Sequence, residues 1–183
     1  MKILISGIAG RMGQELLKEI EESDDFIACA GYDKIKCNNR IPVYDNIEKI
    51  KEKPDVIIDF SNPSATFNIL KYAKENIIPI VIATTGFNDS ETKIINEEYA
   101  KLIPIFKSNN MSYEISLMSE IISNLATKLK EADIEIIETH HRNKIDSPSG
   151  TALMLADSIN ETLGNKLEYV YDRHDKKNKR SNT

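Results

Sequence analysis

The sequence has little cysteine, no basic excess of charge and no long apolar run. Among its 183 residues only Cys29 and Cys37 are cysteines, and their spacing suits neither a CxxC motif nor a disulfide framework. The net charge of -5 gives no electrostatic reason to bind nucleic acid or an anionic membrane. The apolar runs are far too short to span a membrane, and Gly7 interrupts the first one before a signal peptide could form. These absences favour a protein of the reducing cytoplasm.

What the first part of the chain contains is a regular alternation of two kinds of segment. Short apolar runs, predicted as strands, occupy residues 2–6, 26–33, 55–60, 79–85 and 103–106. They are continuously apolar rather than alternating, as in a parallel sheet covered on both faces. Longer amphipathic runs, predicted as helices, occupy residues 11–23, 64–76 and 90–102. This order predicts an α/β fold with an open, doubly wound parallel sheet.

The alternation of short apolar and longer amphipathic segments ends near residue 110. We place a domain boundary there, between 1–110 and 111–183. A longer helix is expected next, and its apolar side chains at spacings of three and four predict one buried face: Met118, Ile121, Ile122, Leu125 and Leu129. A strand at 133–139, a second helix ending at Gly164 and a last strand at 167–171 are expected to follow.

The motif "GIAGRMG" joins the first predicted strand to the first predicted helix. Glycines at 7, 10 and 13 allow a tight turn, close approach of a pyrophosphate and close packing of the helix. Asp33 ends the second predicted strand, where a carboxylate accepts hydrogen bonds from adenosine ribose hydroxyls. This context predicts a dinucleotide site; the alternative is a glycine-rich turn that holds no ligand.

The kind of dinucleotide stays open between NADH and NADPH. Asp33 favours a ribose 2′-hydroxyl, whereas Lys34 and Lys36 could attract a 2′-phosphate. Polar turns end the third and fourth predicted strands, "DFSNP" at 59–63 and "TTGF" at 84–87. They suit contacts to ribose and nicotinamide at the carboxyl edge of the sheet. Either turn alone would be interpreted as an ordinary loop or helix cap.

The stretch "ETHHRNKIDSPSGTA" at 138–152 is the most chemically crowded part of the chain. His140 and His141 follow a predicted strand, Lys144 adds a cation, and Ser149 is placed to cap a helix. A histidine that titrates near neutral pH, a cation and a helix N-terminus together suit an anion that must gain a proton. A small carboxylate fits this description.

Other interpretations of the same stretch compete with this one. The two histidines could bind zinc, although no third ligand stands at a usual spacing. They could also be structural, as isolated histidines often are. We interpret Asp146 as structural, ordering the loop or pairing with Lys144 or Arg142.

Taken together, "GIAGRMG", "DFSNP", "TTGF" and "EIIETHHRNKIDSPSGTA" resemble the 4-hydroxy-tetrahydrodipicolinate reductase family, also called dihydrodipicolinate reductases, of the diaminopimelate route to lysine. The resemblance implies a Rossmann-like cofactor domain followed by an α+β domain that binds the substrate and forms a homotetramer. It implies hydride transfer from NADH or NADPH to a small cyclic dicarboxylate. A related reductase of another small dicarboxylate is the alternative within the same chemistry.

The resemblance also implies roles for individual residues. The pyrophosphate would be held by Gly7, Ile8, Ala9, Gly10, Arg11 and Met12, and the adenosine ribose by Asp33. Further cofactor contacts would come from Ala83, Thr84, Thr85, Ser108, Asn109, Asn110 and Met111. His140 would be the proton donor with Lys144 as its partner, and the substrate carboxylates would be bound by His141, Lys144, Gly150 and Thr151.

The chain departs from the family pattern in two places. Met111 replaces an aromatic residue and Glu114 a glycine, which affects the packing of that loop. Past Arg173 the family continues with strands that carry Arg-Gly-Gly and Gly-Glu-His-Thr motifs, whereas this sequence ends in the polar tail 172–183, expected to be frayed. We therefore expect a truncated second domain with an exposed sheet edge, lower stability and weaker tetramer assembly. The second hypothesis is accordingly a dinucleotide-binding protein with impaired catalysis.

Overall fold

The computed structural model describes residues 1–37, 39–108, 110–142, 144 and 147–171. It forms two compact units, Met1–Asn109 and Asn110–Thr183. Among the helices in these described ranges, none combines the length and the apolarity that a membrane-spanning segment needs. Three predictions from the sequence lie outside the described residues: those for Asn109, Asp146 and the tail 172–183.

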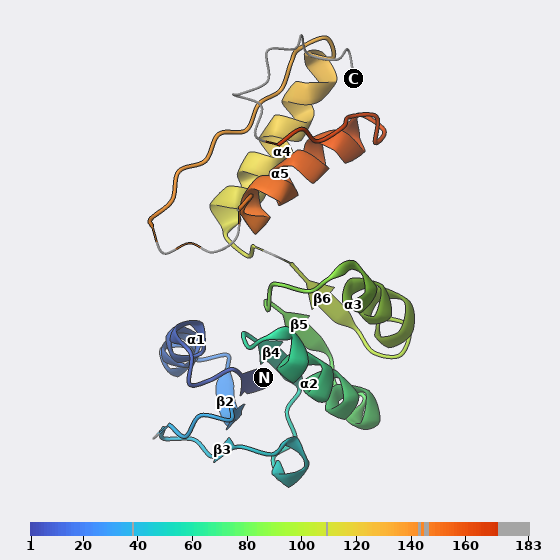
Figure 1. Ribbon diagram of the computed structural model, residues 1–183. Helices are drawn as coiled ribbons and strands as arrows, with labels where there is room; N and C mark the ends of the chain where they lie inside the picture. Colours follow the sequence, from blue (N-terminus) through green and yellow to red (C-terminus); the bar gives the residue numbers. More distant parts are fainter. Residues whose placement is uncertain (38, 109, 143, 145–146, 172–183) are drawn as a thin grey trace. The chain divides into compact units, whose positions relative to one another are not determined.

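The first unit is built on a six-stranded sheet in which every neighbouring pair is parallel (Figure 1). The strands are β1 Lys2–Ser6, β2 Ile27–Tyr32, β3 Val43–Tyr44, β4 Val56–Asp59, β5 Ile80–Ile82 and β6 Ile105–Lys107. Their order is β3-β2-β1-β4-β5-β6, so the chain reverses its direction of travel across the sheet between β1 and β4. This confirms the predicted doubly wound parallel α/β sheet and puts its switch point at the carboxyl ends of those two strands.

Helices follow the strands of this unit: α1 Arg11–Glu21, η1 Ile47–Lys49, α2 Pro63–Asn76, α3 Asp89–Ile94 and the π-helical turn η2 Ile95–Tyr99. Side-chain caps fix where α2 and α3 begin. The Asn62 side chain accepts from the Ala65 N–H at the start of α2, and Asn88 forms a capping box with Glu91 at the start of α3.

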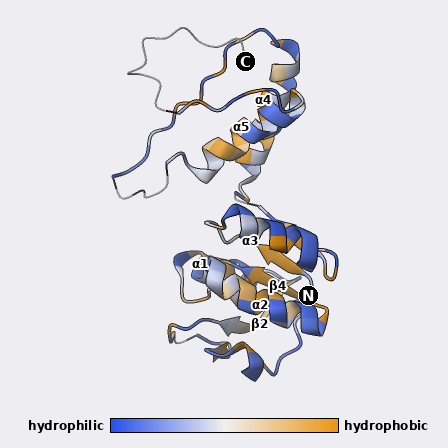
Figure 2. Ribbon diagram, turned by 45° about the vertical axis from the view of Figure 1, so that its right-hand side comes forward, coloured by the Kyte–Doolittle hydropathy of each residue, from blue (hydrophilic) through white to orange (hydrophobic). Residues whose placement is uncertain are grey.

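Apolar side chains cover both faces of the sheet. On one face Ile3 and Ile5 of β1 pack with Leu17 and Ile20 of α1. On the other, Leu4 joins a larger cluster that includes α2 and η2: Ile57, Ile69, Leu70, Ile80, Ile82 and Ile95. Figure 2 shows β4 in the orange of hydrophobic residues. The continuous apolar strands of the sequence are therefore explained, because alternate residues of one strand enter different clusters.

The described residues of the second unit include two helices, α4 Tyr113–Lys128 and α5 Gly150–Thr162, which pack against each other. Small polar side chains make the contact: the Ser119 hydroxyl donates to the Ser158 hydroxyl at 2.7 Å, and the Ser123 hydroxyl donates to the Ser158 carbonyl at 3.2 Å. Ala126 is buried on the same side of α4.

The prediction of a buried apolar face on α4 was wrong for four of its five residues. Met118, Ile121, Leu125 and Leu129 are 45%, 57%, 53% and 53% exposed, and only Ile122 is half-buried. The cause is that serine and alanine allow closer approach of the two helices than branched apolar side chains do, so α5 occupies the small-residue face. No element in the described part of the chain covers the apolar one.

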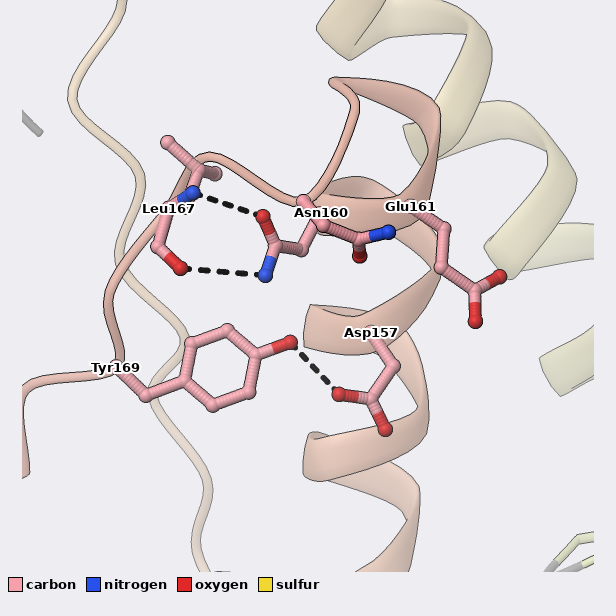
Figure 3. Close-up of a pocket in the computed structure, with 6 residues that line it drawn as sticks. Asp157, Asn160, Glu161, Leu167 and Tyr169 are labelled. Atoms are coloured by element: carbon pink, nitrogen blue, oxygen red, sulfur yellow. Dashed lines mark hydrogen bonds between the residues drawn. The ribbon is translucent and has the colours of Figure 1, made fainter.

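The strands predicted at 133–139 and 167–171 are also wrong, because both segments run as irregular chain in the described part of the structure. A β-rich sequence forms a strand only where a partner strand offers its backbone groups. Here a side chain takes that place: Leu167 donates its N–H to Asn160 Oδ1 at 2.9 Å, and its carbonyl accepts from Asn160 Nδ2 at 3.2 Å (Figure 3). The two segments line a hollow of about 510 Å³ beside α5.

Candidate functional site

Two glycines at the junction of β1 and α1, Gly7 in the turn and Gly13 in the helix, leave no room for a Cβ. Gly7 has φ +78°, and a Cβ there would lie 2.4 Å from the Phe60 carbonyl oxygen. A Cβ on Gly13 would lie 2.3 Å from the Gly7 carbonyl oxygen. Gly10 begins α1 without any side-chain cap, so the N-terminus of an eleven-residue helix opens at the turn. This geometry suits an anionic group held by backbone N–H groups.

Asp33 lies directly against this turn. Its Oδ2 accepts from the Ala9 N–H at 2.9 Å and its Oδ1 from the Ile35 N–H at 2.9 Å. Each carboxylate oxygen keeps a further lone pair, so the group can still accept from a sugar hydroxyl. The structure thus brings the predicted turn and the predicted acid together, although they are 24 residues apart in sequence.

The side chains of the turn point in different directions. Ile8 is fully buried, and its side chain fills the space where a Cβ on Gly31 would lie, 2.6 Å from Ile8 Cδ1. Arg11 and Met12 are exposed. Ile8 therefore offers only backbone to a ligand, whereas Arg11 and Met12 offer side chains.

The loop after β5 divides its two threonines in a similar way. Thr84 is 3% exposed, and its hydroxyl accepts from the Ser61 N–H at 2.9 Å while it donates to Asp59 Oδ2 at 2.9 Å. Thr85 is exposed, and the Ala83 N–H donates to the Asp59 carbonyl at 2.9 Å. The Thr84 side chain is therefore committed to the interior, which the sequence did not indicate.

After β6 the structure describes three of the four predicted contact residues, without Asn109. Ser108 continues the ladder by donating its N–H to the Ile82 carbonyl at 3.2 Å. In the second unit Asn110 accepts from the Ser112 N–H at 2.8 Å and donates to Thr151 Oγ1 at 2.9 Å, which ties the start of α4 to the start of α5. Met111 is 40% exposed.

Glu114, the residue that departs from the family's glycine, is accommodated by Ser112. The Ser112 hydroxyl donates to Glu114 Oε2 at 2.7 Å, and this bond lowers the pKa of the Glu114 carboxyl. The same Ser112 hydroxyl accepts from the Ile115 N–H at 3.3 Å and caps α4. The substitution therefore leaves a well-formed helix start.

The crowded stretch of the second unit is organised by Glu138, a residue that sequence reasoning missed. Glu138 Oε2 lies 2.8 Å from His140 Nε2 and accepts from the Ser149 hydroxyl at 2.5 Å, while Oε1 accepts from the Ser149 N–H at 2.8 Å. The Ser149 hydroxyl bond first, and the His140 bond next, lower the pKa of Glu138 to about 2. Glu138 stands two residues before His140, and in extended chain such residues share a side, which is the signal that could have identified it.

Three predicted residues of this stretch, Ser149, Gly150 and Thr151, lie at the start of α5. The Ser149 hydroxyl accepts from the Ala152 N–H at 3.1 Å and caps the helix, as predicted. Gly150 and Thr151 are the first two residues of that helix. The Lys144 N–H donates to the His141 carbonyl at 3.1 Å, and His141 is exposed while Lys144 is half-buried. Within the described ranges no group of three or more His, Cys, Asp or Glu side chains is placed to hold a metal ion.

The sheet order, the glycine turn at the switch point and the acid at the end of β2 define a dinucleotide-binding protein of the Rossmann type. Comparison with known families narrows this class. The model described as "Dihydrodipicolinate reductase, N-terminus" matches residues 1–111, and the model described as "Dihydrodipicolinate reductase, C-terminus" matches residues 114–183. The chain belongs to the dihydrodipicolinate reductase family.

Individual relatives agree with this assignment. The 4-hydroxy-tetrahydrodipicolinate reductase of Caldanaerobacter subterraneus subsp. tengcongensis is 44% identical over 180 residues, which cover 98% of this chain and 71% of that protein. The enzyme of the same name from Clostridium tetani is 42% identical, with the same coverage. Among solved structures, dipicolinate-bound dihydrodipicolinate reductase from Paenisporosarcina sp. TG-14 matches with a TM-score of 0.73 and 28% identity, over 94% of this chain and 70% of that one.

Proposed function

We propose that this protein reduces 4-hydroxy-tetrahydrodipicolinate to tetrahydrodipicolinate with NADH or NADPH, in the diaminopimelate route to lysine. The observation that carries the proposal is that both halves of the reductase family match consecutive parts of this one chain. The relatives that share 42–44% of its residues carry the name of that reductase.

The first unit supplies the dinucleotide site. The backbone of Gly7–Met12 and the uncapped N-terminus of α1 suit the pyrophosphate, and Asp33 is placed to accept from the adenosine ribose. Lys34 and Lys36 are exposed beside it, so a 2′-phosphate would meet positive charge, and we propose NADH or NADPH as the cofactor. When bound, the nicotinamide supplies the hydride.

The second unit supplies the proton and the charge that holds the substrate. Reduction of the hydroxylated ring adds a hydride and a proton and releases the hydroxyl group as water. We assign the proton to His140, whose ring is oriented by Glu138 at 2.8 Å. His141, Lys144 and the first N–H groups of α5, from Gly150 and Thr151, would bind the two carboxylates.

The proposal is tested by following NADH and NADPH oxidation at 340 nm while dihydrodipicolinate synthase generates the substrate in the cuvette. Turnover with either cofactor supports the reductase. Binding of NADH without any turnover would instead support a dinucleotide-binding protein that lacks catalysis, and would overturn the proposal.

The proton donor is tested by His140→Ala. Because removal of a positioned general acid costs about 10²–10⁴-fold in rate, we expect kcat to fall by that order. The dissociation constant of NADH should not change, since the first unit keeps its own glycine turn and Asp33. An unchanged kcat in this variant would remove His140 from the proposed mechanism.

We also propose a cytoplasmic homotetramer. Free thiols at Cys29 and Cys37 are compatible with a reducing compartment. Self-association is supported by the exposed apolar side chains of α4, because contiguous exposed apolar surface often marks a contact between subunits. Light scattering on the purified protein measures the assembly, and a monomer at all concentrations would contradict it.

A further inference from the structure

Asp59, the last residue of β4, is a fully buried carboxylate to which none of the roles above was assigned. None of the ion pairs among the described residues includes it. A buried carboxylate without a cation is costly unless several donors satisfy its oxygens. Hydrogen-bond donors must therefore surround Asp59.

Four hydroxyl groups surround this carboxylate, two on each oxygen. Oδ1 accepts from Ser6 Oγ at 2.6 Å and from Ser61 Oγ at 2.5 Å. Oδ2 accepts from Thr66 Oγ1 at 2.6 Å and from Thr84 Oγ1 at 2.9 Å. The two oxygens of a carboxylate offer enough lone pairs to accept from all four hydroxyls, so the buried group is satisfied without a cation.

The four donors come from four different elements at one edge of the sheet. Ser6 ends β1, Ser61 lies in the loop after β4, Thr66 is in the first turn of α2, and Thr84 follows β5. The Thr84 hydroxyl also accepts from the Ser61 N–H at 2.9 Å. Asp59 therefore connects the loops that leave three adjacent strands.

The glycine turn rests on this assembly. Gly7 follows Ser6 directly, and the Phe60 N–H donates to the Ser6 carbonyl at 3.0 Å. The Phe60 carbonyl lies so close to Gly7 that a Cβ there would meet it at 2.4 Å. The position of the turn is thus set by the loop that Asp59 holds through Ser61.

We propose that Asp59 is the positioning residue of the cofactor site, which fixes the glycine turn and the loop after β5 relative to each other through four hydroxyl bonds. The inference rests on the proposed dinucleotide site. In this proposal Asp59 is buried and does not contact the ligand. It fixes the position of the loop expected to hold the pyrophosphate relative to the loop expected to hold the nicotinamide.

The test compares Asp59→Asn with Asp55→Asn in the whole protein. Asp55 precedes β4 at the opposite edge of the sheet, where its carboxylate accepts from the Lys2 N–H of β1 at 2.7 Å. Both variants weaken the link between β1 and β4, but only one lies at the ligand edge. NADH binding is titrated by the fluorescence of the cofactor at a temperature where far-ultraviolet circular dichroism shows both proteins folded.

We expect Asp59→Asn to raise the dissociation constant of NADH about tenfold or more, because the amide cannot accept from all four hydroxyls. Asp55→Asn should stay within about twofold of wild type, since the bond that it weakens is remote from the ligand. If Asp59→Asn does not fold, Thr84→Val, which removes one donor, should weaken binding, and Thr84→Ser, which keeps the hydroxyl, should restore it.

Equal affinity in Asp59→Asn and wild type would overturn the inference. So would an equal loss in Asp55→Asn, or equal affinities of Thr84→Val and Thr84→Ser. Failure of the wild-type protein to bind NADH would overturn the proposed dinucleotide site as well, so the two failures are distinguished in one titration series.

Discussion

At the scale of single residues, two carboxylates are held in place by hydroxyl groups. Asp59 receives four hydroxyls inside the first unit, and Glu138 receives the Ser149 hydroxyl and His140 in the second. Hydroxyl donors are short and hold a carboxylate at a fixed distance, whereas lysine would hold it on a flexible chain. Both arrangements therefore suit positioning more than charge neutralisation.

Glu138 gives the second unit a defined response to acid. Its pKa falls from the ordinary 4.5 to about 2, first because of the Ser149 hydroxyl and then because of His140. A carboxyl with a lowered folded-state pKa stabilises the protein above its unfolded pKa, and this contribution is lost as the pH falls from about 4.5 towards about 2. We expect Glu138→Gln to reduce the loss of stability in that window, measured by urea unfolding monitored by circular dichroism at several pH values.

Glu138→Gln also tests whether Glu138 orients the His140 ring, separately from its effect on stability. At pH 7 Glu138→Gln should lower kcat more than it changes the KM for NADH, because the His140 ring loses its charged partner while the first unit is unaltered. An unchanged kcat together with an unchanged acid profile would show that the contact of Glu138 with His140 has no role.

At the scale of elements, the junction of β1 and α1 depends on the absence of side chains. A Cβ on Gly13 would lie 2.3 Å from the Gly7 carbonyl oxygen and 2.7 Å from Ile8 Cα, both of them backbone atoms that cannot rotate away. A Cβ on Gly10 would meet only the Gly7 carbonyl oxygen, at 3.2 Å. The N-cap glycine and the glycine inside α1 therefore differ sharply in the side chains that they tolerate.

We expect Gly13→Ala to lose roughly 1–3 kcal/mol of unfolding free energy, as overpacked sites do, and to weaken NADH binding. Gly10→Ala is the matched control and should lose clearly less stability. Denaturant unfolding of both variants measures the difference; equal losses would mean that the close contact at Gly13 relaxes freely.

Sequence patterns were sufficient to predict some of the strands and not others. The core strands were predicted because residues buried on both faces form unbroken apolar runs, as in β1 and β4. The two-residue β3 was not predicted, since so short a segment carries no pattern. The segment 133–139 is not a strand in the described structure, and the neighbouring segment is held at Leu167 by the Asn160 side chain.

The same distinction applies to the sites. The contact between Asp33 and the glycine turn follows from strand order, so the sequence could predict it. The Asp59 cluster could not be predicted in that way, because its donors come from four elements and Ser6 is 53 residues away. Serine and threonine near strand ends are too common to indicate which of them share one carboxylate.

At the scale of the whole molecule, the two units differ in how completely they cover their apolar surface. The first has two buried clusters on either side of its sheet. In the second, Leu117, Met118, Ile121 and Leu125 of α4 are each more than 40% exposed. Surface of this kind favours association between molecules.

We therefore expect assembly to depend on the exposed face of α4. Replacing Ile121 and Leu125 by lysine and glutamate should lower the mass measured by light scattering at a given concentration. Leu102→Lys is a suitable control, because Leu102 is 53% exposed and belongs to the first unit. If the α4 variant keeps the wild-type mass, another surface carries the association.

The burial of Ile8 has a consequence for the rate at which a dinucleotide associates. Its side chain is held between β2 and the core, with Gly31 leaving the space that it fills, so the centre of the turn cannot swing open without unpacking the sheet. A site that is already in its final form needs no slow closing step after the first encounter. In stopped-flow mixing, the observed rate should rise linearly with NADH concentration and reach no plateau.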